Sequence, residues 1–194
     1  MAIAVEEDKI ITDKEQIQLI LKGDNEAFLC LYRRYYERIY RLAYGMAGRA
    51  QTAEDLTQEI FFRMHQKLDR FDGTSGFSTW FYRLAVNCSL NYRRGDKNES
   101  KMEAIEDIEL LPNPDYSNGF EENILKKEVQ SHIRCSLLTL KPKLRMVFIL
   151  KDIEGMTYDE IAVRMDCSAG TVASRLSHAR LQMAHSLKHL RGTF

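Results

Sequence analysis

Five side chains between residues 80 and 94 have the types and spacing that suit contact with single-stranded nucleic acid. At about 100° per residue they fall on one stripe of a helix, separate from an apolar stripe that includes Phe81, Ala85 and Cys88. A base can stack on an indole, guanidinium groups can contact phosphates, and asparagine amides can bind an exposed base edge. A helix that only packs into a core would explain the apolar stripe but not the aligned polar one. The five residues are Trp80, Arg83, Asn87, Asn91 and Arg94.

The loop before this helix, residues 72–76, has the sequence DGTSG. Its composition is typical of a turn that leads into a helix. Its two glycines also allow a backbone to approach a ligand closely. Together with Phe77 and Trp80, the loop could form a pocket for a base turned out of the stack.

A second candidate site lies in residues 156–190, which read MTYDEIAVRMDCSAGTVASRLSHARLQMAHSLKHL. Thr157 with Glu160 predicts a capping box, and Ser168 predicts the cap of a second helix. The pattern favours a helix-turn-helix over an unrelated helical hairpin, because the capping residues, the small Ala162 at the helix crossing and a basic second helix coincide. Side chains on the outward face of that second helix suit phosphates and base edges in a major groove. They are Thr171, Ser174, Arg175, Ser177, His178 and Arg180.

A third surface is predicted on a helix running from Thr52 to about Leu68. Leu56, Ile60, Met64 and Leu68 form its narrow inward face. Asp55, Gln58, Glu59 and Phe62 lie at i, i+3, i+4 and i+7 on the outward face. This is either a solvated flank with one stray phenylalanine or a docking patch for a partner helix, with an aromatic anchor and a polar rim.

The elements that carry these residues are all predicted to be helices. Capping signals at Thr12 with Glu15, at Asp24 and at Pro142 mark further helix starts. The net charge of the whole chain is zero, but the net charge is +1 over residues 1–95, −6 over 96–128 and +5 over 129–194. The acidic segment also contains two prolines and a glycine, which is typical of a linker. We therefore expect an all-α fold with small helical domains at 1–95 and 129–194, joined by a flexible acidic linker at 96–128.

Several classes of protein are disfavoured. No run approaches the roughly 18 apolar residues of a membrane span and the start of the chain is charged, so no membrane insertion and a cytoplasmic location are expected. No nucleophile–base pair or Walker-type loop indicates an enzyme, and no cofactor is expected. His178, His185 and His189 share one helix flank, but without an accompanying carboxylate or thiolate we expect no metal site.

Two segments resemble the two modules of bacterial extracytoplasmic-function (ECF) sigma factors, a small group of the sigma-70 family. They read AEDLTQEIFFRMHQKLDRFDGTSGFSTWFYRLAVNCSLNYRR and TLKPKLRMVFILKDIEGMTYDEIAVRMDCSAGTVASRLSHAR. The resemblance covers nearly the whole chain, and the ordered pair of motifs is specific. It implies an alternative sigma factor that directs core RNA polymerase to promoters.

The resemblance also implies a role for each surface. The outward face holding Asp55 and Phe62 would bind the clamp helices of the polymerase β′ subunit. The loop through Phe77 and the stripe with Trp80, Arg83 and Asn87 would open the −10 element and hold its non-template strand. The helix from Thr171 to Arg180 would read the −35 element. The linker would pass through the polymerase cleft, and the β subunit, promoter DNA and an anti-sigma factor would be further partners.

The sequence departs from the family pattern at two positions. Ala173 stands where a basic residue is usual, which removes one expected −35 contact. Asp166 replaces a frequent glycine in the turn of the helix-turn-helix, where a left-handed backbone conformation is needed. A stand-alone helix-turn-helix regulator is the alternative, but it leaves residues 53–94 unexplained.

Overall fold

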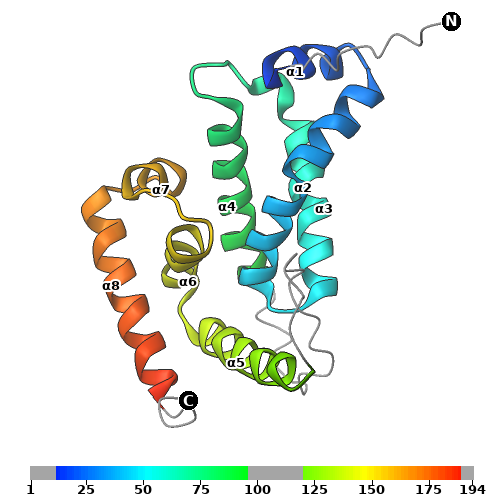
Figure 1. The fold of residues 1–194 in the computed structure, drawn as a ribbon. Coiled ribbons are helices and arrows are strands. Elements are labelled where there is room, and N and C mark those ends of the chain that lie inside the picture. Colours follow the sequence, from blue (N-terminus) through cyan, green and yellow to red (C-terminus); the bar gives the residue numbers. More distant parts are fainter. Residues whose placement is uncertain (1–11, 96–119, 189–194) are drawn as a thin grey trace, which may run out of the picture.

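Every regular element in the described part of the chain is helical, as predicted (Figure 1). The structure is a computed structural model that describes the backbone of residues 12–95 and 120–188, with side chains described for 12–92 and 129–188. The first half contains α1 (Asp13–Leu21), α2 (Asn25–Ala47), α3 (Ala50–Gln66), the short η1 (Leu68–Arg70) and α4 (Phe77–Gly95). The second half contains α5 (Phe120–Thr139), α6 (Pro142–Phe148), the π-helical turn η3 (Ile149–Ile153), α7 (Tyr158–Met165) and α8 (Ala169–Ser186).

The helix starts follow the capping residues of the sequence. The hydroxyl of Thr12 accepts a hydrogen bond from the backbone N–H of Glu15, whose carboxylate accepts one from the N–H of Thr12, which completes the predicted capping box. Asp24 caps α2 as expected. The third helix begins at Ala50 and not at Thr52, because Gly48 adopts a left-handed conformation (φ 79°) that ends α2 and turns the chain at once.

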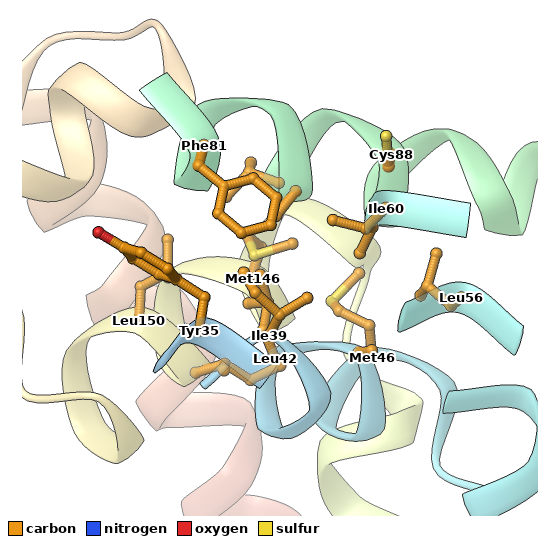
Figure 2. Close-up of a cluster of buried hydrophobic side chains, with 14 of the residues drawn as sticks. Tyr35, Ile39, Leu42, Met46, Leu56, Ile60, Phe81, Cys88, Met146 and Leu150 are labelled. Atoms are coloured by element: carbon orange, nitrogen blue, oxygen red, sulfur yellow. The ribbon is translucent and has the colours of Figure 1, made fainter. Parts of the chain in front are cut away.

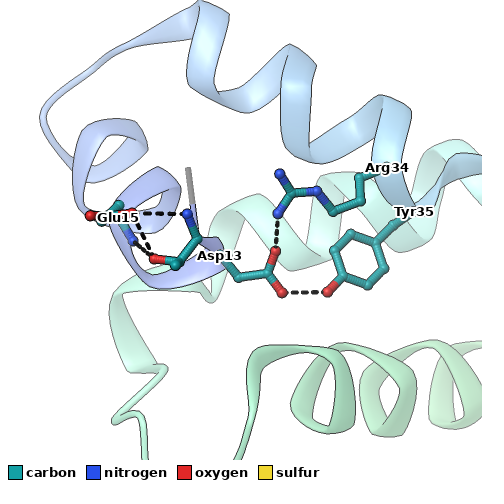
Figure 3. A network of polar contacts seen from close by, with 5 residues as sticks. Asp13, Glu15, Arg34 and Tyr35 are labelled. Atoms are coloured by element: carbon teal, nitrogen blue, oxygen red, sulfur yellow. Dashed lines mark hydrogen bonds and ion pairs between the residues drawn. The ribbon is translucent and has the colours of Figure 1, made fainter. Parts of the chain in front are cut away.

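A polar contact ties the first helix to the second (Figure 3). Asp13 accepts hydrogen bonds from the Arg34 guanidinium and from the Tyr35 hydroxyl on α2. Burial, followed by the hydrogen bond to Asp13, raises the pKa of Tyr35 far above its usual value of 10.0. The phenol therefore stays protonated and continues to donate to the carboxylate.

One hydrophobic core spans both halves of the chain. Ile39 and Leu42 of α2 and Phe81 of α4 meet Met146 of α6 and Leu150 of η3, and all five side chains are fully buried (Figure 2). The sequence predicted two domains joined by a tether but did not predict that they pack together. The contact between the halves therefore adds tertiary structure that neither module would have alone.

The first helix of the second half begins inside the segment expected to be linker. α5 starts at Phe120, so the backbone of residues 120–128 is helical. Residues 96–119, the remainder of the predicted linker, lie outside the described part of the structure. Pro142 opens α6 at its first turn, as the sequence indicated.

Candidate nucleic-acid interfaces

The helix α4 has the two distinct sides that its sequence predicted. Phe81 and Ala85 on one side are fully buried in the shared core, where Figure 2 shows Phe81 pointing inward. Arg83, Asn87 and Asn91 on the other side are exposed. One helix can therefore pack into the protein and still present polar groups outward. We call Trp80, Arg83, Asn87 and Asn91 the single-strand surface.

Trp80 lies at the margin of the core. Its ring is half-buried and contacts Phe71 and Phe77, with centroid distances of 5.5 and 5.7 Å. These contacts hold the indole in place while leaving part of it accessible. A positioned aromatic ring of this kind can receive a base with less loss of side-chain entropy than a freely rotating one.

Phe77 corrects the predicted site. Only 4% of its surface is exposed, and its ring contacts Tyr35 and Phe81 at centroid distances of 5.5 and 5.7 Å. The first residue of α4 thus belongs to the aromatic core and is not available to stack on a base. Arg94 lies outside the residues whose side chains are described, so its place on the surface stays a prediction.

The loop before α4 forms a compact turn. The Asp72 carboxylate accepts hydrogen bonds from the backbone N–H and the hydroxyl of Thr74, at 3.0 and 2.8 Å. These bonds lower the pKa of Asp72, the backbone bond having the larger effect. Gly73 has a φ of 73°, a conformation that favours glycine. The shape of the loop that leads into α4 is thereby fixed four residues before Trp80.

The outward face of α3 presents the third predicted surface, which we call the α3 surface. Asp55 and Gln58 are exposed, and 59% of Phe62 is accessible although it is a large apolar residue. Glu59 accepts a hydrogen bond from Arg63 one turn later. An exposed aromatic residue surrounded by polar groups has the makeup of an interface anchor with a rim.

The second half contains the predicted helix-turn-helix, formed by α7 and α8. Thr157 and Glu160 form the capping box of α7, and Ser168 caps α8 by accepting a hydrogen bond from the N–H of Thr171 at 3.1 Å. Asp166 adopts the left-handed conformation (φ 50°, ψ 58°) that the turn requires. The turn is therefore made without the glycine that is frequent there.

The outward side chains of α8 differ in how firmly they are held. Ser174, Ser177 and His178 are exposed. Arg175 is half-buried and donates a hydrogen bond to the Cys167 sulfur at 3.6 Å. Its side chain therefore reaches toward the turn between α7 and α8. The sequence did not predict this contact or the pairing of Arg180 Nε with an Asp152 carboxylate oxygen at 3.1 Å. We call the predicted set the duplex surface; its members are Thr171, Ser174, Arg175, Ser177, His178 and Arg180.

Two buried arginines were missed by the sequence reasoning. Arg145 of α6 is fully buried and donates hydrogen bonds to main-chain carbonyls of Leu137, Leu138 and Leu140 at the end of α5 and of Met46 near the end of α2. Arg164 of α7 is 8% exposed. Arg145 stands within the apolar run LRMVFIL, four residues before the buried Ile149. This position was the one signal in the sequence that its side chain is buried.

Membrane spans and metal sites are two further features that bear on function. Among the residues described, no helix combines the length and the apolar character that crossing a bilayer requires. Within the same residues, no group of three or more His, Cys, Asp or Glu side chains is arranged to hold a metal ion. His178 and His185 are exposed on α8, and His189 lies outside the described residues.

Comparison with known proteins assigns the chain to a family. Residues 31–99 match the family Sigma-70 region 2, and residues 132–183 match Sigma-70, region 4. The ECF RNA polymerase sigma-E factor of Escherichia coli is 32% identical over 180 residues, which cover 88% of this chain and 91% of that protein. The chain belongs to the ECF sigma factors of the sigma-70 family. It is thus a transcription initiation factor that directs RNA polymerase to promoters, and not an enzyme.

Other relatives agree with this assignment. The RNA polymerase sigma-H factor of Pseudomonas aeruginosa is 31% identical to this sigma factor over 183 residues, 92% of this chain and 95% of that one. Two solved structures share its fold. One is CnrH in complex with the cytosolic domain of CnrY (TM-score 0.64, 21% identity, 91% of this chain and 97% of that chain). The other is RpoE in complex with the anti-sigma factor NepR from Bartonella quintana (TM-score 0.61, 23% identity, 83% and 96%).

Proposed function

We propose that this sigma factor opens the −10 promoter element with the single-strand surface of α4. The two-sided character of that helix is the observation that carries the proposal. The buried side fixes α4 in the core, so Trp80, Arg83, Asn87 and Asn91 keep a defined spacing. Unpaired bases of the non-template strand then gain a stacking partner and polar contacts that paired bases in the duplex cannot reach. This difference in binding favours the open form and needs no nucleotide hydrolysis.

We further propose that the duplex surface of α8 binds the −35 element in the major groove. The helix lies in the part of the chain with a charge of +5, which favours approach to DNA. Exposed Ser174, Ser177 and His178 are placed to reach base edges. Because Ala173 carries no charge, the positive charge on this surface comes from Arg175 and Arg180, and the Asp152 carboxylate offsets that of Arg180. We propose domain limits of 1–95 and 129–194 for these two roles, with residues 120–128 forming the start of α5.

Arg175→Ala is expected to weaken holoenzyme binding to promoter duplex and to lessen its salt dependence. Losing one phosphate contact reduces the slope of log affinity against log salt concentration by about 1. Binding measured at a series of salt concentrations checks this. Lys188→Ala serves as the matched control, because it removes one exposed positive charge of the same domain outside the duplex surface. A slope that Arg175→Ala leaves unchanged would exclude a phosphate contact.

We propose that the α3 surface binds the clamp helices of the β′ subunit, with Phe62 as the anchor. Phe62→Ala is then expected to weaken binding to core polymerase by about 2 kcal/mol, roughly 30-fold, as for a typical interface anchor. The protein should remain folded, because the ring is 59% exposed. Titration of core polymerase with labelled protein measures the loss. Leu21→Ala is the control, since Leu21 is 55% exposed on α1. Equal effects of both substitutions would contradict a specific anchor.

We also propose that a protein inhibitor of the anti-sigma class binds this sigma factor. The support is the shared fold with CnrH and RpoE, both of which were solved as complexes with a protein partner. We expect the chain to act in the cytoplasm with the polymerase β and β′ subunits.

Run-off transcription with core polymerase on a promoter library tests the proposed function as a whole. Transcripts that depend on the added chain and start at a common pair of −35 and −10 sequences are expected. The same library identifies the promoter sequence. Absence of chain-dependent transcripts on every promoter would overturn the proposal.

A further inference from the structure

The outward side of α8 contains one large apolar side chain. Leu181 is 70% exposed, the highest value among the large apolar residues of the described part of the chain. The buried side of the helix, which includes Leu176 and Ala179, faces the core, and Leu181 lies on the opposite side at the edge of the molecule (Figure 1). A single exposed leucine is ordinary on a protein surface, so its exposure alone indicates no function. Its position relative to the polar side chains of the same helix is the informative feature.

Leu181 continues a line of polar side chains along α8. Four exposed residues lie at i, i+3, i+4 and i+7, within roughly 100° of one another around the helix axis. They are Ser174, Ser177, His178 and Leu181. Thr171 and Arg175, which flank this line, are half-buried. The outermost line of α8 therefore consists of three members of the duplex surface followed by an apolar residue.

This spacing suits a helix that reads base pairs. The recognition helix of homeodomains contacts the major groove through residues at i, i+3, i+4 and i+7. Ser174 and Leu181 are seven residues apart, about 10 Å along the helix at 1.5 Å per residue. At about 3.4 Å per base pair, this distance corresponds to roughly three base pairs. When Ser174 faces one base pair, Leu181 can therefore reach the groove about three pairs away.

The chemistry of the side chain limits what Leu181 can recognise in the groove. A leucine side chain has no hydrogen-bond donor, acceptor or charge, so it binds neither the polar edge of a base nor a phosphate. The C5-methyl group of thymine is the apolar group that base pairs present in the major groove. Contact between this methyl group and Leu181 removes apolar surface of both from water, which is favourable. Thymine is therefore the base that Leu181 is suited to select.

We propose that Leu181 is a specificity-determining residue, which contacts the C5-methyl group of a thymine in the −35 element. This inference rests on the proposed binding of α8 in the major groove. Ser174, Ser177 and His178 bind polar base edges nearer the start of the helix. Leu181 selects thymine at the far end of the same line.

Replacement of thymine by deoxyuridine tests this contact, because it removes the C5-methyl group and keeps every hydrogen-bonding group of the base. The probe is a promoter duplex that supports chain-dependent run-off transcription, with each −35 thymine replaced in turn. One replacement is expected to weaken holoenzyme binding about fourfold, the effect of losing the burial of one methyl group. Titration of the labelled duplex with holoenzyme measures the change.

Substitutions of Leu181 identify the residue that reads the methyl group. Leu181→Ala should bind the thymine and deoxyuridine duplexes equally, and it should remain folded because the side chain is 70% exposed and alanine favours a helix. Leu181→Met keeps an apolar side chain and should retain the difference. Leu21→Ala is the matched control, since it makes the same change at a leucine that is 55% exposed on α1. It should also retain the difference.

Two results would overturn the inference. One is a −35 element that contains no thymine, or one whose deoxyuridine duplexes all bind the unaltered chain as tightly as the thymine duplex. The other is a loss that persists in Leu181→Ala, since another residue then reads the methyl group.

A promoter in which every −35 base pair is replaced by a different one separates this inference from the proposed function of α8. Unchanged holoenzyme binding to that promoter would remove both. Weakened binding to it, combined with either of the two contrary results, would leave −35 recognition by α8 standing and remove only the role of Leu181.

Discussion

Arg145→Met is expected to lower the free energy of unfolding by about 3–5 kcal/mol, the largest stability change predicted for this chain. The guanidinium donates to four main-chain carbonyls, including those of Leu137 at 2.9 Å and Met46 at 2.7 Å. These carbonyls lie at or near the ends of α5 and α2, where the last carbonyls of a helix run out of intrahelical donors and the helix dipole favours a positive charge. The Leu137 carbonyl also accepts a hydrogen bond from the backbone N–H of Leu140 at 3.2 Å. Methionine fills similar space but leaves the buried carbonyls without this donor. Urea titration followed by circular dichroism measures the change.

Arg164→Met is the matched control for this prediction. Arg164 is also a buried arginine, but its Nε lacks a hydrogen-bond partner among the described residues. Its replacement removes an unsatisfied donor together with a charge, so the stability should change by less than about 1 kcal/mol. If both variants lose the same stability, the carbonyl contacts of Arg145 are not the cause.

Trp80→Ala is expected to reduce open-complex formation by about tenfold or more while core polymerase binding stays within about twofold. Stacking on the indole contributes about 1–3 kcal/mol per base, and only the unpaired strand can use it. Permanganate reactivity of thymines in the −10 element measures opening, and titration with core polymerase measures binding. The indole is half-buried, so the fold should tolerate the change at a cost smaller than for a fully buried ring.

Trp80→Phe is the control, because it retains an aromatic face in the same contacts with Phe71 and Phe77. It should retain most of the opening activity. Equal losses of opening and of polymerase binding in Trp80→Ala would indicate that the ring serves only the core.

The local structure was largely readable from the sequence. Capping at Thr12, Asp24, Thr157 and Ser168 and the two sides of α4 were predicted correctly, because each depends on residues within about one or two helical turns. Phe77 was placed wrongly for a related reason. Periodicity indicates which side of a helix is buried, but at a first turn the neighbouring loop and α2 decide how far the burial extends.

The packing between the halves could not be read from the sequence. The pattern of α2 shows that Ile39 and Leu42 are buried, but it does not show that Met146 covers them. Arg145 is a stronger example, because a charged residue is assigned to the surface unless its partners are known. One partner, Met46 near the end of α2, lies 99 residues before Arg145 in the sequence, and only the tertiary fold brings the two together.

The core shared by Ile39, Leu42, Met146 and Leu150 also sets a cost for any partner that would separate the two halves. Separation exposes these side chains to water on both halves, and at about 25 cal/mol per Å² the exposure is unfavourable. With the halves apart and these side chains uncovered, the chain would tend to self-associate. A partner that draws the halves apart must consequently cover these side chains with apolar surface of its own.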